Sequence, residues 1–280
     1  MVKKNSNGEI HIVKESEYRQ KLLEQLLNGK THFYDHLTGN FENYHSCWIA
    51  PQCAILEYLI QYILKNNNRK PEDLQPFLEI GSFTSHLSGY LSTKYNLAGF
   101  CGDLKTTIIE RSFKEILPRL GLKSDNIKSV VAEASNLYFE DESLSFVFCF
   151  SSLHHFKDPV RCLKEIRRVL KPGGIFLCAH EPVQPRFRKC RVPLDSSAVK
   201  YGLIENVYTL SEYKKIISSN FNNFVILPYN DLRTPKDLKG GMKRIVSEIL
   251  TILNCRKLYL LKYIIINLWG GQDFSAIVQK

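Results

Sequence analysis

The sequence predicts an α/β protein built on a doubly wound, mostly parallel sheet. From residue 76 onward, short apolar runs alternate with segments whose apolar residues recur at helical spacing, which is typical of parallel strands joined by helices. The chain has 280 residues, of which 44% are hydrophobic and 24% charged, so it can bury a large core. We expect N-terminal helices and a C-terminal insertion beside this sheet.

Strands and helices are expected to alternate along the core. Strands are predicted at 77–80, 97–101, 127–131, 144–150 and 175–179. Helices are predicted at 85–95, at 107–120 and from Pro159 to Leu170. Asp158 and Pro159 suit the N-cap and the first position of the third helix, and Pro172-Gly173-Gly174 is expected to stop it. Right-handed crossovers would make all five strands parallel.

Four segments follow from these patterns. Residues 1–75 are predicted to form an N-terminal helical cap, most clearly at 53–64, where the apolar positions fit one wide buried face. Residues 76–182 hold the predicted core. Residues 183–267 are longer than this fold requires, so we expect a substrate-recognition segment with late core elements: a capped helix starting within 205–213 and a strand at 224–228. Residues 268–280 hold the last strand, at 274–278.

Cysteine spacing and the absence of long apolar stretches indicate the compartment. Eight cysteines occur without any Cys-x-x-Cys pair, and several lie in apolar runs, so buried reduced thiols are expected. The N-terminus has no apolar leader, and no run of about 18 apolar residues exists that could span a membrane. The predicted location is the cytoplasm.

The residues that follow each strand are the candidate site, because doubly wound sheets bind ligands beyond the carboxyl ends of their strands. Gly81 follows the first strand, where glycine allows a tight turn and a close approach to a ligand. Asp103 follows the second, where an acidic side chain can accept hydrogen bonds from both ribose hydroxyls of a nucleoside. Glu133 follows the third strand, and Ser151 and the residues up to His155 follow the fourth.

Residues 76–181 resemble the class I S-adenosylmethionine-dependent methyltransferases, in particular those of small molecules and lipids. Glu79-Ile80-Gly81 is similar to their first motif, and Gly102-Asp103-Leu104 to their acidic ribose-binding motif. Residues 132–139 resemble the segment that flanks the adenine, and residues 145–156 the fourth strand with its loop. Residues 165–174 are the most specific match. A weaker resemblance extends to residues 269–278.

The resemblance implies a Rossmann-like class I methyltransferase fold and S-adenosyl-L-methionine as the cofactor. It also implies in-line transfer of a methyl group to a small-molecule, glycan or lipid acceptor. The cofactor-binding residues that it implies are Glu79, Gly81, Ser82, Phe83, Asp103, Leu104, Glu133, Ala134 and Ser151.

The chain departs from the family at two glycines of the first motif, which are Phe83 and Ser85 here, and at a strand-four acidic residue, which is Val147. Those glycines let the backbone lie against the methionine part of the cofactor. Binding therefore requires the Phe83 side chain to turn into the core, and Ser85 is expected to cap the following helix. The alternative is a catalytically inactive binding or scaffolding module with the same fold.

Three residues are candidates for catalysis. Acceptors that start protonated benefit from a general base, and histidine has a suitable pKa for this role. His155 is the first candidate, followed by His154 and then Glu181, because they follow strands four and five beside the expected methyl position. The alternative is that one histidine packs inward and the other shapes the pocket.

No metal site is expected, because His32 and His36 share a helix face only if that segment is helical, and no third ligand lies nearby. Tyr34 lies in a segment that resembles the aromatic part covering the cofactor in many relatives. An ordinary buried aromatic is the simpler alternative for Tyr34.

Positive charge is concentrated near the C-terminus and bears on the partners. The net charge is +10, and residues 183–280 contain 16 Lys and Arg against 7 Asp and Glu. Such a surface attracts an anionic acceptor or acidic lipid headgroups, so peripheral membrane contact at 258–266 is the alternative to a core helix there. A nucleic-acid partner is not expected, because Ser-Ser-Leu-His stands where base methyltransferases carry Asn-Pro-Pro or Asp-Pro-Pro. A dinucleotide dehydrogenase is disfavoured, because the first turn lacks the three-glycine spacing of that class. The sequence does not indicate the oligomeric state.

Overall fold

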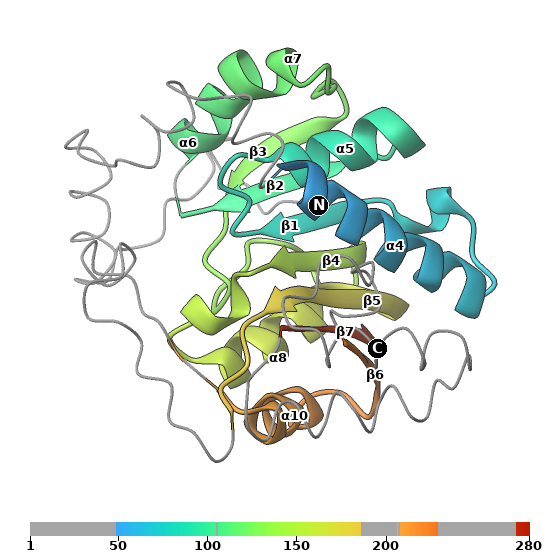
Figure 1. The fold of residues 1–280 in the computed structure, drawn as a ribbon, viewed down its shortest axis with the longest axis vertical. Helices are drawn as coiled ribbons and strands as arrows, with labels where there is room; N and C mark the ends of the chain where they lie inside the picture. Colours follow the sequence, from blue (N-terminus) through green and yellow to red (C-terminus); the bar gives the residue numbers. More distant parts are fainter. Residues whose placement is uncertain (1–48, 105, 186–205, 207, 229–272) are drawn as a thin grey trace, which may run out of the picture.

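The computed structural model describes residues 49–104, 106–185, 206, 208–228 and 273–280, and in this part of the chain one seven-stranded sheet forms the centre (Figure 1). Its strand order is β3-β2-β1-β4-β5-β7-β6. The strands are β1 (Phe77–Ile80), β2 (Gly99–Asp103), β3 (Ile127–Val131), β4 (Leu144–Phe150), β5 (Leu170–Glu181), β6 (Asn223–Pro228) and β7 (Phe274–Gln279).

The first five strands are parallel, and β7 is antiparallel to both of its neighbours, β5 and β6. This confirms the predicted doubly wound, mostly parallel sheet. The strand predicted at 97–101 lies two residues later, at Gly99–Asp103, where Gly99 pairs with Phe77.

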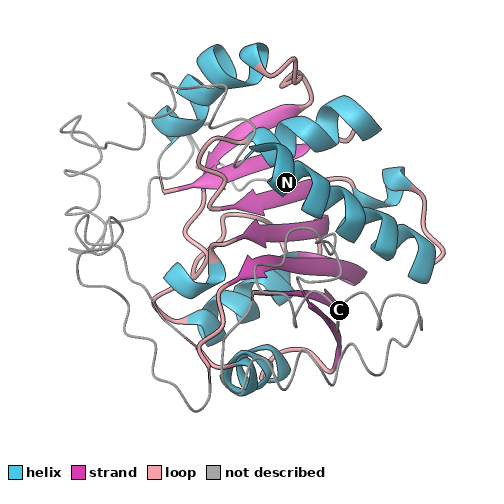
Figure 2. Cartoon of the chain, viewed as in Figure 1, coloured by secondary structure: helices cyan, strands magenta, loops and turns pink. Residues whose placement is uncertain are grey.

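Helices cover both faces of the sheet (Figure 2). On one face lie α4 (Ala50–Asn66) and α5 (His86–Tyr95), and on the other α8 (Pro159–Val169) and α10 (Leu210–Ser218). The helix predicted at 107–120 is three pieces: α6 (Thr106–Arg111), a π-helical turn η3 (Ser112–Ile116) and α7 (Leu117–Arg119). Short 3-10 turns are η2 (Pro71–Leu74) and η4 (Leu153–His155).

Alternation of side chains along the central strands builds two cores. On β4, Phe146 and Phe148 pack in the cluster under α4 and α5, while Val147 and Cys149 pack in the cluster under α8 and α10. Every residue of β4 is buried, because helices cover both faces. This explains the nearly continuous apolar run in the sequence, which is typical of central parallel strands.

The ends of α8 agree with the prediction at one side and differ at the other. Asp158 Oδ1 accepts a hydrogen bond from Arg161 N at 3.0 Å, so the predicted N-cap is confirmed. The helix ends at Val169, and Pro172-Gly173-Gly174 lies within β5. The residue before a proline avoids helical backbone angles, so the helix stops before reaching Pro172.

The motif at 165–174 holds the segment between β3 and β4. Glu165 Oε2 accepts a hydrogen bond from Leu137 N at 3.1 Å. The Arg168 guanidinium donates to the carbonyl oxygens of Leu137 and Phe139 at 2.7 and 2.8 Å, and to Asp141 at 2.7 Å. The motif therefore fixes the stretch that follows Glu133 and Ala134.

Several predictions concern residues outside the described part: Tyr34, His32 and His36, most of the N-terminal cap, most of 183–267, and the apolar stretch 258–266.

The five cysteines in the described part of the chain are all free thiols: Cys53, Cys101, Cys149, Cys162 and Cys178. None of the helices between residues 49 and 228 that the structure describes is long and apolar enough to cross a bilayer.

Candidate functional site

The carboxyl ends of the parallel strands meet along one edge of the sheet, on the left in Figure 1. The turn after β1 is tied to β2, because Gly81 N and Ser82 N both donate to Gly102 O, at 2.9 and 3.0 Å. The turn after β2 is tied to β3 through Ala132 N, which donates to Asp103 O at 2.8 Å. The candidate residues after the strands are therefore neighbours.

Gly81 brings the ends of β1 and β4 into contact. Its φ of +73° lies in the left-handed region, and a Cβ added there would lie 2.6 Å from Ser152 Oγ. No other L-residue fits without moving Ser152, which gives the glycine of the first motif a steric reason.

Asp103 is half-buried and oriented by the backbone. Its Oδ2 accepts a hydrogen bond from Phe83 N at 3.0 Å, and its Oδ1 accepts one from Leu104 N at 2.7 Å. Burial raises the pKa of Asp103 from its ordinary value, although the two amide hydrogen bonds oppose the rise. Each carboxylate oxygen can accept a further hydrogen bond, so the side chain fits a ligand that carries two neighbouring hydroxyls.

The loop after Gly81 is strained where the family has glycine. Phe83 and Ser85 have φ values of 38° and 52°, which L-residues rarely adopt. Ser85 occupies the N-cap position of α5 but makes no capping hydrogen bond, so that prediction is wrong. In left-handed geometry its hydroxyl does not meet the free N–H groups of the helix. Phe83 is half-buried at the sheet edge and is not part of the hydrophobic clusters.

Three polar atoms of this loop are buried without a hydrogen-bond partner among the residues that the structure describes: Ser82 Oγ, Ser85 Oγ and His86 Nε2. His86 Nδ1 lies 2.5 Å from Thr84 Oγ1, and burial lowers the pKa of His86 to about 4, so its ring is neutral at pH 7. The loop therefore differs in chemistry from a glycine loop, which offers only backbone groups.

Glu79 is turned toward α5. Its Oε2 accepts hydrogen bonds from the backbone N of Ser88, at 3.1 Å, and from the Ser88 hydroxyl. Burial raises the pKa of Glu79 to about 8, the Ser88 hydrogen bonds oppose this, and the Asp103 charge adds to it. Glu79 thus joins β1 to α5 and is mostly protonated at pH 7.

The segment after β3 forms a small turn. Glu133 Oε1 accepts a hydrogen bond from Ser135 Oγ at 2.9 Å, and Glu133 O accepts one from Asn136 N at 2.9 Å. Ala134 is buried in the core between them. The half-buried Glu133 therefore remains at the sheet edge, near the end of β2.

Glu181 and His154 form a buried pair at the ends of β5 and β4. Glu181 is 0% exposed and His154 is 6% exposed. Glu181 Oε1 accepts from Ser152 N and Leu153 N, both at 2.9 Å, and Oε2 lies 2.7 Å from His154 Nδ1 and accepts from His154 N at 3.2 Å. Burial by itself raises the pKa of Glu181, but the His154 interactions and the amide hydrogen bonds outweigh it and lower that pKa. Glu181 is therefore a charged carboxylate that holds the loop after β4.

His155 is the more accessible of the two adjacent histidines. It is half-buried, and its ring centroid lies 3.9 Å from that of His154. Its backbone N donates to Ser152 O at 3.0 Å, within η4. The structure brings His155, His154 and Glu181 together, with His155 outermost.

Sequence reasoning missed a second histidine cluster, formed by Ser151, His180 and Asp273. Ser151 Oγ lies 2.8 Å from His180 Nδ1, and His180 Nε2 lies 3.3 Å from Asp273 Oδ2. The sequence does place His180 directly before Glu181, after the fifth predicted strand, but it assigns His180 no role. Asp273 carries no local signal, because it reaches this edge only when β7 pairs with β5.

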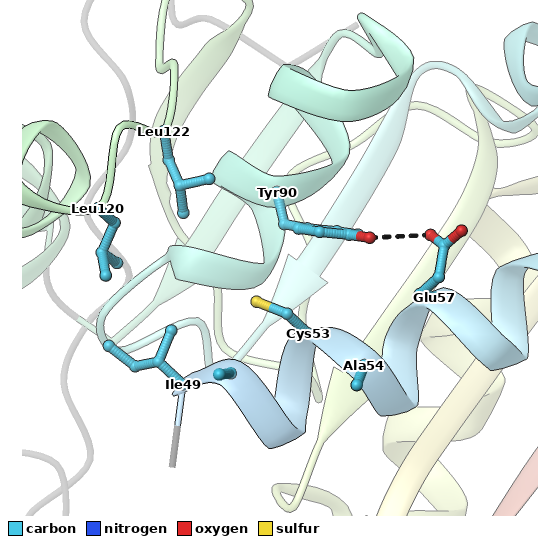
Figure 3. A pocket seen from close by; sticks show the side chains of 8 residues that line it. Ile49, Cys53, Ala54, Glu57, Tyr90, Leu120 and Leu122 are labelled. Carbon is cyan, nitrogen blue, oxygen red and sulfur yellow. Dashed lines mark hydrogen bonds between the residues drawn. The ribbon is translucent and has the colours of Figure 1, made fainter. Parts of the chain in front are cut away.

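A cavity of about 460 Å³ lies between α4 and α5, away from the strand-end loops (Figure 3). Its lining is mostly apolar, with Ile49, Cys53, Leu120 and Leu122, and Tyr90 donates a hydrogen bond to Glu57 at its rim, at 3.0 Å. None of its lining residues follows a strand, so we do not assign it to the cofactor. Among the described residues, no three His, Cys, Asp or Glu side chains gather as a metal site.

Comparison with known proteins points to methyltransferases. Residues 78–178 match a family model described as a methyltransferase domain. A demethylmenaquinone methyltransferase of Staphylococcus saprophyticus is 33% identical over 94 residues, which are 33% of this chain and 40% of that protein. One from Staphylococcus aureus is 31% identical over 93 residues, 32% of this chain and 39% of the relative. The chain thus matches less than half the length of these relatives.

Solved structures show the same fold at low sequence identity. The Haemonchus contortus phosphoethanolamine N-methyltransferase 2, in complex with phosphomonomethylethanolamine and S-adenosylhomocysteine, has a TM-score of 0.59 and 17% identity, over 95% of this chain and 60% of that one. The [4+2]-cyclase SpnF has a TM-score of 0.50 and 16% identity, over 80% of each chain. Because this likeness includes a cyclase, the fold by itself does not name the reaction.

The fold is the Rossmann-like fold of class I S-adenosylmethionine-dependent methyltransferases, and the methyltransferase-domain match lies within it. Residues 78–178 of this chain form its matched part, and S-adenosylmethionine is the cofactor of the class.

Proposed function

We propose that this protein transfers a methyl group from S-adenosylmethionine to a small-molecule acceptor. The observation that carries this proposal is the Asp103 carboxylate, held at the end of β2 by the Phe83 and Leu104 amides with hydrogen-bonding capacity to spare. It stands beside Gly81, where an added Cβ would lie 2.6 Å from Ser152 Oγ, so glycine lets the ends of β1 and β4 meet there.

Different strand-end residues hold different parts of the cofactor in this proposal. Asp103 accepts hydrogen bonds from the two ribose hydroxyls, and Leu104, Glu133 and Ala134 line the adenine side. Gly81, Ser82 and Phe83 face the methionine part, and Ser151 lies at the end of β4 beside them. Glu79 acts indirectly, by fixing α5 through Ser88. When bound, S-adenosylmethionine supplies a methyl group on a positively charged sulfur.

The acceptor meets His155 in this proposal. His155 is half-buried and lies against the buried pair of His154 and Glu181. Glu181 fixes both His154 and the η4 turn that carries His155. His155 is then the catalytic residue, and His154 and Glu181 are positioning residues. Their rigidity matters because methyl transfer depends on the in-line approach of the acceptor.

The class of acceptor rests on the relatives and on charge. The relatives are named demethylmenaquinone methyltransferases, which favours a quinone acceptor over a glycan or a phospholipid. The excess of basic residues in 183–280 favours an anionic acceptor and is compatible with work at a membrane surface from the cytoplasm. The alternative is an inactive scaffold, and the strained Phe83 and Ser85 motivate it.

A methyl-transfer assay tests the proposal. The full chain is incubated with S-adenosyl-[methyl-14C]methionine and, separately, reduced demethylmenaquinone, a phosphoethanolamine, a glycan and a phospholipid vesicle. We expect labelled product with one of the small molecules, and a loss of about 100-fold in rate for His155→Ala, because the acceptor then loses the side chain that holds it in line with the methyl group. Lys157→Ala, at an exposed neighbouring position, is the control. A folded protein that labels none of the acceptors contradicts the proposal and favours the scaffold.

A further inference from the structure

Ser151, His180 and Asp273 form a connected line of proton-exchanging groups at the sheet edge. Ser151 Oγ lies 2.8 Å from His180 Nδ1, and the opposite ring nitrogen, Nε2, lies 3.3 Å from Asp273 Oδ2. All three residues are half-buried, so the line is partly shielded from solvent but still accessible.

The histidine ring in this line is held on one face and at both ring nitrogens. Phe150 stacks on it, with ring centroids 5.4 Å apart and planes 11° from parallel. The backbone N of His180 donates to Ser275 Oγ at 3.2 Å, and the Ser151 hydroxyl donates to His180 O at 2.8 Å. Ser151 and His180 both have positive φ values, 48° and 55°, so two strand ends adopt costly backbone angles to bring these side chains together.

The two histidine clusters are separate. Glu181 follows His180 in the chain but turns to His154 and the amides of η4, whereas His180 turns to Ser151 and Asp273. Asp273, directly before β7, faces the His180 ring, while Glu181 faces His154. The pair beneath His155 therefore does not include the His180 line.

We propose that Ser151, His180 and Asp273 are a proton relay that removes the proton of the acceptor during the methyl transfer proposed above. Ser151 is then the catalytic residue that touches the acceptor, and His180 and Asp273 act through it. His155 orients the acceptor, and the relay receives the proton. The inference rests on the proposed methyl transfer, and it adds a proton-accepting role that methyl transfer by itself does not assign to these residues.

The proton balance of the step is complete. In the tautomer that carries its proton on Nε2, His180 Nδ1 can accept. The Ser151 hydroxyl turns from His180 O to this nitrogen and passes its proton there as an acceptor hydroxyl gives its own proton to Ser151 Oγ. The imidazole then carries a proton on both nitrogens, and its positive charge is paired with the Asp273 carboxylate, as in serine–histidine–aspartate sites. The acceptor loses one proton and gains a methyl group delivered as its cation, so its charge does not change.

Nitrogen NMR of the full chain labelled with [15N]histidine tests the line without any acceptor. At pH 8 we expect His180 to show an accepting Nδ1 and a protonated Nε2, with the His180→Gln variant assigning the signals. Ser151→Ala is expected to shift the Nδ1 signal, and Asp273→Asn the Nε2 signal. Ser143→Ala and Asp125→Asn, at other loop positions, are the matched controls. If neither test variant moves the His180 signals, the relay is overturned.

Kinetics with the acceptor that the wild-type protein methylates test the catalytic role. Ser151→Ala and His180→Gln are expected to lower kcat by about 100-fold and to remove the acid limb of its pH profile, with KM changed less than about threefold. Asp273→Asn is expected to lower the rate, because its amide can hold the His180 ring in the tautomer that does not accept a proton at Nδ1. Asp273→Glu keeps a carboxylate and is expected to restore most of that lost rate.

The outcomes separate this inference from the proposed function. Wild-type-like rates in Ser151→Ala and His180→Gln, with the acid limb lost only in His155→Gln, overturn the relay and leave the methyltransferase in place. A wild-type protein that methylates none of the acceptors overturns the proposed function and the catalytic role of the relay together. Calorimetric binding of S-adenosylmethionine should stay unchanged in His180→Gln, and a lost signal there also counts against the relay.

Discussion

Glu181→Gln is expected to destabilise the protein by about 3–5 kcal/mol, as the loss of one partner from a buried ion pair does. Glu181 is 0% exposed, and its two oxygens accept from the backbone N of Ser152, Leu153 and His154. A glutamine would turn its NH₂ group toward at least one of these N–H donors, so one hydrogen bond becomes a repulsive contact. Urea unfolding followed by circular dichroism measures the loss.

The pH dependence of this effect has a definite sign. Because the pKa of Glu181 is lowered in the folded protein, its contribution to stability is present above the pKa of an unfolded glutamate and is lost as the pH falls through the folded pKa. The difference between wild type and variant should therefore shrink in acid. Glu115→Gln, which breaks an exposed pair with Arg111, is the control and should cost about 0.5 kcal/mol at most. A Glu181→Gln variant as stable as this control would contradict the account of the η4 loop.

Gly81→Ala is expected to cost about 3 kcal/mol, from backbone strain at positive φ and from overpacking. Its φ is +73°, and the new Cβ would lie 2.6 Å from Ser152 Oγ and 3.1 Å from Ser152 Cβ. The ends of β1 and β4 would have to separate, so binding of the cofactor should weaken as well. Unfolding curves and calorimetry on the same preparations measure both effects.

Gly121→Ala separates the two causes of that loss. Gly121 also has a positive φ, +66°, but no atom lies within 4 Å of the position of its added Cβ. It should therefore show only the backbone part, about 1 kcal/mol. The double variant Gly81→Ala, Ser152→Ala should recover part of the difference. Equal losses at the two glycines would show that the β1 and β4 ends do not touch.

The order of strands and helices in the core was predictable from the sequence, because hydrophobic periodicity reports burial directly. The apolar run 144–150 became β4, buried on both faces, and Asp158 with Pro159 began α8. The residues after the strands were predictable for the same reason, since parallel strands place their carboxyl ends at one edge. That is how Gly81, Asp103 and His155 could be found.

Details that depend on tertiary contacts were not predictable. The cap at Ser85 failed because the loop enters α5 in left-handed geometry, which side-chain identity does not reveal. The helix at 107–120 contains a π-helical turn, and β5 begins at Leu170 rather than after Gly174. The inward turn of Glu79 to Ser88 and the pairing of His180 with Asp273 arise from packing between elements distant in sequence.

Calorimetric titration with S-adenosylmethionine and S-adenosylhomocysteine, on wild type and on Asp103→Ala, tests the central claim most directly. We expect saturable one-to-one binding by the wild type, and a loss of roughly 10- to 100-fold in affinity for Asp103→Ala, as for hydrogen bonds to a charged group. Asp125→Ala, an equal change of charge at an exposed position before β3, should bind as the wild type does. No saturable binding by folded wild-type protein at millimolar cofactor, or equal binding by Asp103→Ala, would contradict the account.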